Sequence, residues 1–119
     1  MGDLSPHFSR HEFACNCGCG FDTVDFDTLN TLEIIHDYFL APVTINSGCR
    51  CADWNDQCGG SEGSLHMQAR AADIVVEGIA SWEVADFTEQ VLNGRGGVGR
   101  YDTFTHVDTR SNGPARWSG

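Results

Sequence analysis

The clearest pattern in the chain is a run of apolar residues at helical spacing between residues 25 and 40. Residues three and four apart share one face of a helix, so this spacing predicts an amphipathic helix. Asp25 or Asp27 can cap its first N–H groups, and Pro42 prevents it from continuing far past residue 40. The apolar positions are Phe26, Leu29, Leu32, Ile34, Ile35 and Phe39.

A second amphipathic pattern covers residues 79–92 and predicts another helix. Ala80 or Ser81 lies near its N-cap, and Asn93-Gly94 supplies residues that commonly end helices. We expect its apolar side chains to point mostly inward. They are Trp82, Val84, Ala85, Phe87, Val91 and Leu92.

Three short β-prone runs, at residues 43–46, 71–76 and 104–109, predict strands. Alternation along a strand places side chains two apart on one face, so Phe104, His106 and Asp108 should share a face. Short helices are expected within residues 4–13, where Phe8 and Phe13 are apolar anchors, and over residues 53–57. The sequence thus mixes helices and strands without long stretches of either.

The rest of the chain predicts turns and loops. Residues 96–99 are glycine-rich but lack the Lys-Ser/Thr of a phosphate loop and the full dinucleotide pattern, so we interpret them as a turn. Residues 110–119 are interpreted as a polar tail, with Trp117 as a lid on the core. No repeat or linker divides the chain, and we expect its 119 residues to form one domain, residues 1–119.

Composition narrows the class. The 14 glycines and 3 prolines favour a loop-rich α+β domain over a helical bundle. A net charge of -10 disfavours binding to nucleic acid phosphates or to an anionic membrane surface. No apolar run is long enough for membrane insertion, and residues 1–7 lack the basic start and apolar centre of a signal peptide. We therefore expect synthesis in the cytoplasm without an export signal.

The cysteines occur in two groups along the chain. Without an export signal, the inference of disulfides from their number weakens. Two groups of thiolates can also bind a structural zinc ion, although Cys-x-Cys differs from the usual Cys-x2-Cys spacing. We expect disulfides or free thiols, with a second metal site as the alternative. The two groups are Cys15, Cys17 and Cys19, and Cys49, Cys51 and Cys58.

Candidate chemistry centres on His66, Asp73 and His106. Two imidazoles and a carboxylate suit a catalytic zinc ion that keeps a fourth position for water. His66 and Asp73 are seven residues apart, and the small Ala69 and Ala71 between them allow close approach of the backbone. The alternative is that His66 caps a turn, Asp73 caps a strand end and His106 is a core histidine. The residues alone leave both interpretations open.

Three segments resemble one known family. Residues 64–73 carry Ser-x-His-x-x-Ala-x-Ala-x-Asp, residues 47–51 carry Ser-Gly-Cys-Arg-Cys, and residues 106–108 carry His-Val-Asp. Together with residues 4–13 and 115–117, they resemble the zinc D-alanyl-D-alanine carboxypeptidase family (peptidase M15-like), in particular its small phage-like branch. The resemblance covers nearly the whole chain and implies a hedgehog/D-Ala-D-Ala peptidase-like fold, with helices packed on a small antiparallel sheet.

Two residues depart from the family pattern. Ala69 stands where the family has glycine, which matters if the turn needs a positive φ. Cys49 replaces a tyrosine that can contact substrate.

The resemblance also implies roles for the site residues. His66, Asp73 and His106 would bind Zn²⁺, and metal-activated water would attack a peptide carbonyl held or polarised by Arg50. The positions where relatives carry the general base hold Thr103 and Phe104 here.

Two aspartates are therefore candidates for the general base. Asp108 is favoured over Asp102 because it shares a strand face with His106. Asp108 could instead orient a histidine ligand.

The function implied by the resemblance is a zinc carboxypeptidase or endopeptidase. It would hydrolyse a peptide bond in the stem peptide of bacterial peptidoglycan, next to a D-amino acid. We expect a monomer that acts on the cell wall as a phage or prophage lysis enzyme. Two alternatives are a zinc-containing binding or structural module of the same fold without turnover, and a cysteine–zinc interaction domain in which His66 and Asp73 are incidental.

Overall fold

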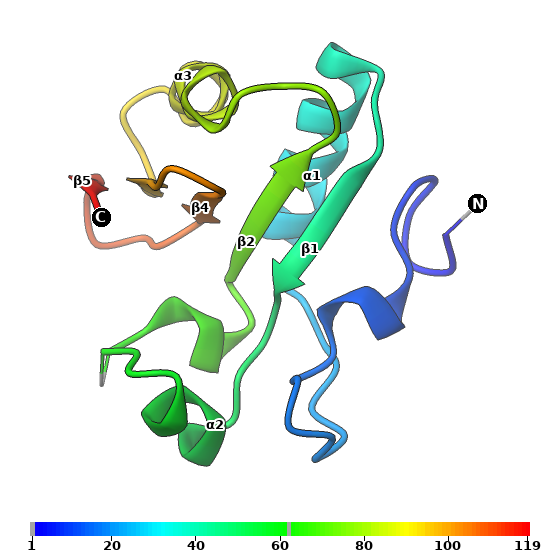
Figure 1. Ribbon diagram of the computed structural model, residues 1–119, viewed down its shortest axis with the longest axis vertical. Helices are drawn as coiled ribbons and strands as arrows, with labels where there is room; N and C mark the ends of the chain where they lie inside the picture. The colour runs from blue at the N-terminus through cyan, green and yellow to red at the C-terminus, as the bar shows by residue number, and fades with distance from the viewer. Residues whose placement is uncertain (1, 62) are drawn as a thin grey trace.

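The computed structural model, which describes residues 2–61 and 63–119, has helices and strands interspersed along most of the chain and three successive strands at its end (Figure 1). The strands are β1 (Val43–Ser47), β2 (Ala71–Val76), β3 (Gly97–Arg100), β4 (Thr105–Asp108) and β5 (Ala115–Ser118). The α-helices are α1 (Phe26–Phe39), α2 (Ala52–Gln57) and α3 (Ser81–Leu92), and the 3₁₀ helices are η1 (Arg10–Phe13) and η2 (Leu65–Gln68). The α+β class predicted from the sequence is confirmed.

The five strands form one sheet in the order β1-β2-β4-β3-β5. The pairs β1/β2, β2/β4 and β4/β3 are antiparallel, as expected, whereas β5 runs parallel to β3. The sheet is therefore mixed. The difference arises because residues 115–118, which we expected in a polar tail, return beside β3 and complete the edge of the sheet.

Both long helices form where the sequence predicts them. The Asp25 carboxylate caps α1 by accepting the N–H of Asp27, and α3 ends at Asn93 in the left-handed conformation. Trp82, expected inward, is exposed instead because it lies off the narrow buried stripe of α3. None of the helices in the described part of the chain has the length and apolarity needed to cross a membrane.

The core lies between α1, α3 and one face of the sheet (Figure 1). Alternate residues of β2 and β4 point into it, so the residues between them face the opposite side. On that opposite side lie Asp73 of β2 and both His106 and Asp108 of β4. The buried apolar cluster consists of Phe8, Phe13, Leu32, Ile35, Val43, Ala72, Ile74, Val76, Val84, Ala85, Leu92, Val98 and Val107.

The glycine-rich segment is strand β3 rather than the turn we predicted. A Cβ on Gly97 would collide with the carboxylate of Asp108, and one on Gly99 would collide with the Trp117 ring. These glycines are thus required by neighbours across the sheet, since they leave space for large polar and aromatic side chains on the face opposite the helices.

Ala69 ends η2 in the left-handed conformation, with φ 58° and ψ 30°. The Cβ makes this conformation cost about 1–2 kcal/mol, whereas glycine costs about 0.5–1 kcal/mol in chain entropy. Ala69 is also buried, so its replacement by glycine loses a buried methyl group, at a cost of about 0.8 kcal/mol. We therefore expect the free energy of unfolding of Ala69→Gly in urea denaturation to exceed that of Ala71→Gly by about 1–2 kcal/mol, because only the substitution at residue 69 relieves a left-handed conformation. Ala71→Gly, at a buried position of strand β2, is the matched control because it loses the same methyl group without that relief; an Ala69→Gly variant as destabilised as Ala71→Gly would contradict the expectation.

Glu33 of α1 fastens the N-terminal segment to the helix. One carboxylate oxygen accepts the Ser5 hydroxyl at 2.5 Å and the His7 N–H at 2.7 Å, and the other lies 2.7 Å from the His7 ring nitrogen. The His7 ring also stacks on His36. Burial opposes ionisation of Glu33, but the hydrogen bonds from Ser5 and His7 outweigh it and lower the pKa of Glu33.

This lowered pKa makes stability pH-dependent. A carboxyl group with a depressed folded-state pKa stabilises the fold above its unfolded pKa, near 4.5, and loses that contribution as the pH falls through the folded value. Glu33→Gln should therefore be less stable than wild type at neutral pH, with a deficit that shrinks below about pH 4. Urea denaturation across this range measures the deficit. Glu77→Gln, at an exposed position, is the control; a Glu33→Gln deficit independent of pH would refute the assignment.

Candidate metal centre

The register of two strands brings Asp73 and His106 together. They are direct cross-strand partners in the antiparallel pair β2/β4, and both side chains are buried. Ser47 of β1 is paired with Asp73 on its other side. Three strands therefore fix the position of the Asp73 carboxylate at the sheet surface.

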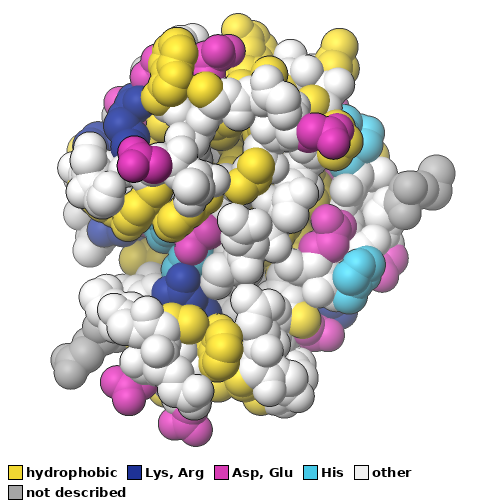
Figure 2. All heavy atoms as spheres, viewed as in Figure 1, with side chains coloured by type: hydrophobic (Ala, Val, Ile, Leu, Met, Phe, Trp, Pro, Cys, Tyr) yellow, Lys and Arg dark blue, Asp and Glu magenta, His cyan; other side chains and the backbone are white. Residues whose placement is uncertain are grey.

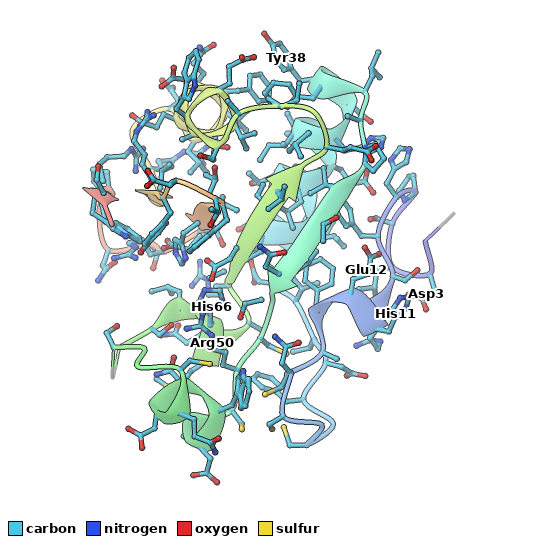
Figure 3. The ribbon with its side chains drawn as sticks, viewed as in Figure 1. Asp3, His11, Glu12, Tyr38, Arg50 and His66 are labelled. Atoms are coloured by element: carbon cyan, nitrogen blue, oxygen red, sulfur yellow. The ribbon has the colours of Figure 1, made fainter. Side chains whose placement is uncertain are left out.

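His66 reaches the same point from η2. The Ser64 hydroxyl caps this short helix by accepting the His66 N–H, and the left-handed Ala69 turns the chain into β2. As a result, ligand atoms of His66, Asp73 and His106 lie within 4.8 Å of one another. Figure 3 shows His66 next to Arg50, at the end of the sheet where β2 begins.

Hydrogen bonds on the outer side of each ring hold the two histidines in place. His66 Nδ1 donates to the Gly48 carbonyl at 2.6 Å, so its Nε2, 3.2 Å from Asp73 Oδ1, carries a lone pair. His106 lies between two carboxylates, with Nε2 2.8 Å from Asp108 Oδ2 and Nδ1 2.9 Å from Asp73 Oδ1. In the neutral tautomer that carries its proton on Nε2, Nδ1 presents a lone pair to Asp73. With both rings in these neutral tautomers, two lone pairs face the Asp73 oxygen and repel it, and a proton or a metal ion between them relieves the repulsion.

The pKa shifts reflect the same preference for positive charge. Burial opposes ionisation of Asp73, but when His106 and His66 carry protons on the nitrogens that face it, their hydrogen bonds lower the pKa of Asp73 below its usual range. Burial likewise disfavours a charged His106, but its bonds to Asp108 and Asp73 prevail and raise the pKa of His106. The centre thus holds an ionised carboxylate and attracts a cation.

Asp108 lies fully buried behind His106. The Arg110 guanidinium donates two hydrogen bonds to the Asp108 carboxylate, from Nε to Oδ1 at 2.9 Å and from Nη2 to Oδ2 at 2.7 Å. The backbone N–H of Arg110 also donates to Oδ1. Burial opposes ionisation, but these bonds and the one from His106 lower the pKa of Asp108 below its usual range. Arg110 was not predicted as a site residue, although its position two residues after Asp108 was a usable signal.

Arg50 stands at the rim of the centre. Its Nη2 donates to Asp73 Oδ2 at 3.2 Å, its Nε to Ser47 at 3.1 Å, and its Nη1 to Asn55 at 3.3 Å. Its backbone N–H donates to the His66 carbonyl. The guanidinium is therefore held beside the three candidate ligands, and its predicted role toward substrate stays a prediction.

A cavity of about 420 Å³ opens onto the centre, and Figure 2 shows arginine, histidine and acidic side chains meeting in a hollow of this surface. Trp117 forms one wall: its Nε1 donates to the Tyr101 hydroxyl, and its ring centroid lies 5.0 Å from that of His106. We had expected Trp117 to cover the apolar core, but it covers the polar centre instead. The remaining lining includes Arg50, Gly59, Gly60, Ser61, Gly63, Ser64, Leu65, His66, Asp73, Phe104 and Arg110.

Neither candidate for the general base lines this cavity. Asp102 borders a separate cavity beside α3, and Asp108 is hidden behind His106. Among the described residues that line the cavity of the centre, Asp73 is the one carboxylate.

Comparison with known families identifies the family to which the chain belongs. The family model described as Peptidase M15 matches residues 6–108, a range that contains all three residues of the centre. The chain belongs to the peptidase M15 family. No curated protein shows significant similarity to it.

Membership makes the protein a hydrolase of the metallopeptidase class and confirms the resemblance found in the sequence. The match ends at Asp108, yet two cavity residues of this M15 peptidase, Arg110 and Trp117, come later in the chain. The last strand therefore adds a wall to the cavity outside the matched region.

The cysteines of this M15 peptidase are all free thiols in the structure. Cys51 does not associate with its sequence neighbours but joins the first group, with Cys15, Cys17 and Cys19. Cys49 is buried, its sulfur lies 2.9 Å from two backbone carbonyls, and burial raises its pKa to about 11.

Proposed function

We propose that this M15 peptidase is a zinc enzyme that hydrolyses a peptide bond in peptidoglycan stem peptides, next to a D-amino acid. The observation that carries the proposal is the convergence of two histidine ring nitrogens and the Asp73 carboxylate at one point of the cavity. For metal–ligand distances near 2.05 Å, the edges of a tetrahedral site are about 3.3 Å. The separations of 3.2 and 2.9 Å between the ring nitrogens and Asp73 are compatible with such a site.

The donor set fits zinc, with two nitrogens and one oxygen and with each outer ring nitrogen already occupied. Zinc bound there supplies a Lewis acid that acidifies water and polarises a carbonyl group. The protein itself supplies fixed ligand orientation: Gly48 holds the His66 ring, Asp108 holds the His106 ring, and Asp73 contributes negative charge.

Arg50 is suited to hold the substrate. A guanidinium has five N–H donors, and three of those of Arg50 are used by Ser47, Asn55 and Asp73. The remaining donors are available to a peptide carbonyl or a terminal carboxylate, and the rigid cation needs little reorganisation when charge develops there.

The substrate class rests on the cavity and on the family resemblance. Arg50 and Arg110 place positive charge in the cavity of a chain whose net charge is -10. Stem peptides carry carboxylates that such cations attract, and the Tyr101 and Trp117 rings offer an apolar wall to the peptide. The resemblance also supports action on the bacterial wall as a phage or prophage lysis enzyme.

We assign Asp108 a positioning role through His106. Both of its oxygens are engaged by Arg110 and His106, and its lowered pKa makes it a weak proton acceptor. The general base itself stays a prediction, with Asp108 and Asp102 as the candidates.

We expect the purified protein to cleave muropeptides, to lose activity on chelation and to regain it with zinc. His66→Ala removes one ligand and should lower kcat/KM by about 10³-fold or more, whereas His11→Ala, an exposed histidine on η1, should leave activity unchanged. Release of muropeptide fragments, followed by chromatography, measures both. Zinc binding without any cleavage would favour the non-catalytic module, and cleavage in excess chelator would exclude the metal mechanism.

The two aspartates make different predictions. Asp108→Asn should weaken zinc binding at the His66 centre about 10–100-fold, because His106 loses the partner that fixes its tautomer. Asp102→Asn should leave zinc affinity unchanged. Competition with a chromophoric chelator measures affinity, and the pH–rate profile measures base function. If Asp108→Asn keeps its zinc affinity but its pH–rate profile loses the fall in rate at low pH, Asp108 is instead the base.

A further inference from the structure

Four cysteines from distant parts of the chain meet away from the cavity. Cys15, Cys17 and Cys19 lie in the loop between η1 and α1, and Cys51 precedes α2. Figure 3 shows sulfur atoms gathered where this loop approaches α2. The catalytic centre uses none of them, so their convergence calls for a separate explanation.

The spacing of the sulfur atoms matches a tetrahedral metal site. Cys15 and Cys17 have their Sγ atoms 3.4 Å apart, and Cys51 Sγ lies 3.8 Å and 3.6 Å from them. Cys19 completes the group, since all four sulfurs lie within 4.8 Å of one another. A zinc ion with Zn–S bonds of about 2.3 Å separates its sulfurs by about 3.8 Å, whereas a disulfide needs about 2.05 Å.

We propose that Cys15, Cys17, Cys19 and Cys51 bind a structural zinc ion. Four thiolates close its coordination shell, so this ion has a structural role and no open position for substrate. It is a second metal site, distinct from the centre formed by His66, Asp73 and His106.

The backbone around the sulfurs favours thiolates. The N–H of Cys51 points at Cys15 Sγ, and the N–H of Trp54 points at Cys51 Sγ, each at 3.4 Å. Such donors stabilise sulfur that carries negative charge. The other two cysteines differ: the Cys49 thiol donates to a backbone carbonyl, and Cys58 is exposed outside the group.

A bound zinc ion would also stabilise the loop of residues 14–25. Residues 14–25 form neither helix nor strand, and residues 16–20 are exposed, so little apolar burial holds them in place. Gly18 and Gly20 adopt positive φ, which lets the chain fold back around the alternate cysteines. With zinc bound, the loop would be linked to Cys51, next to Arg50 of the cavity.

Cobalt substitution tests the proposal directly, because Co²⁺ bound by thiolates gives an intense near-ultraviolet charge-transfer band that histidine and carboxylate ligands do not give. Reduced full-length protein, stripped of metal and titrated with Co²⁺, should show this band at about one equivalent per chain. Zinc should then displace the cobalt and remove the band. The band should persist in His66→Ala, which isolates the cysteine site from the proposed catalytic centre.

Matched serine variants locate the site. Cys17→Ser/Cys19→Ser removes two exposed ligands and should abolish the four-thiolate spectrum, whereas Cys58→Ser should retain it. If the double variant does not fold, the wild-type titration still decides the question. Absence of the band in reduced wild-type protein, or an undiminished band in the double variant, would overturn the proposal.

Discussion

Two histidine nitrogens that face one buried carboxylate oxygen impose the constraint on which this site depends. Their outer nitrogens are committed to the Gly48 carbonyl and to Asp108, so the rings cannot turn to avoid Asp73. A buried arrangement of this kind is costly unless a cation occupies it. The surrounding backbone, from the cap at Ser64 to the pairing of β2 with β4, maintains the arrangement.

Most of the fold follows from local patterns in the sequence. Helices α1 and α3 and strands β1, β2 and β4 appear where periodicity predicts them, because each buries one regular face. Strands β3 and β5 do not, since nothing local marks them. Gly97 and Gly99 resemble turn residues, and only the side chains of Asp108 and Trp117 across the sheet explain why glycine is needed there.

In the site, too, sequence spacing predicts some features, whereas others depend on tertiary contacts. The spacing of His66 and Asp73 predicted a pair of candidate ligands, whose side chains lie 3.2 Å apart, and strand alternation correctly placed Asp108 beside His106. Alternation gives the face of a side chain but not its depth, so it could not reveal that Asp108 is sealed behind the histidine by Arg110. The grouping of Cys51 with the N-terminal loop likewise depends on tertiary structure.

The parallel strand β5 also determines where the chain leaves the fold. Gly119 donates its N–H to the Arg100 carbonyl and lies against the Tyr101 ring, which lines the cavity, while the N-terminal segment lies on the other side of the molecule (Figure 1). Any polypeptide joined after Gly119 therefore emerges beside the cavity mouth. An affinity tag placed there would crowd incoming substrate, whereas a tag at the opposite terminus would leave the entrance clear.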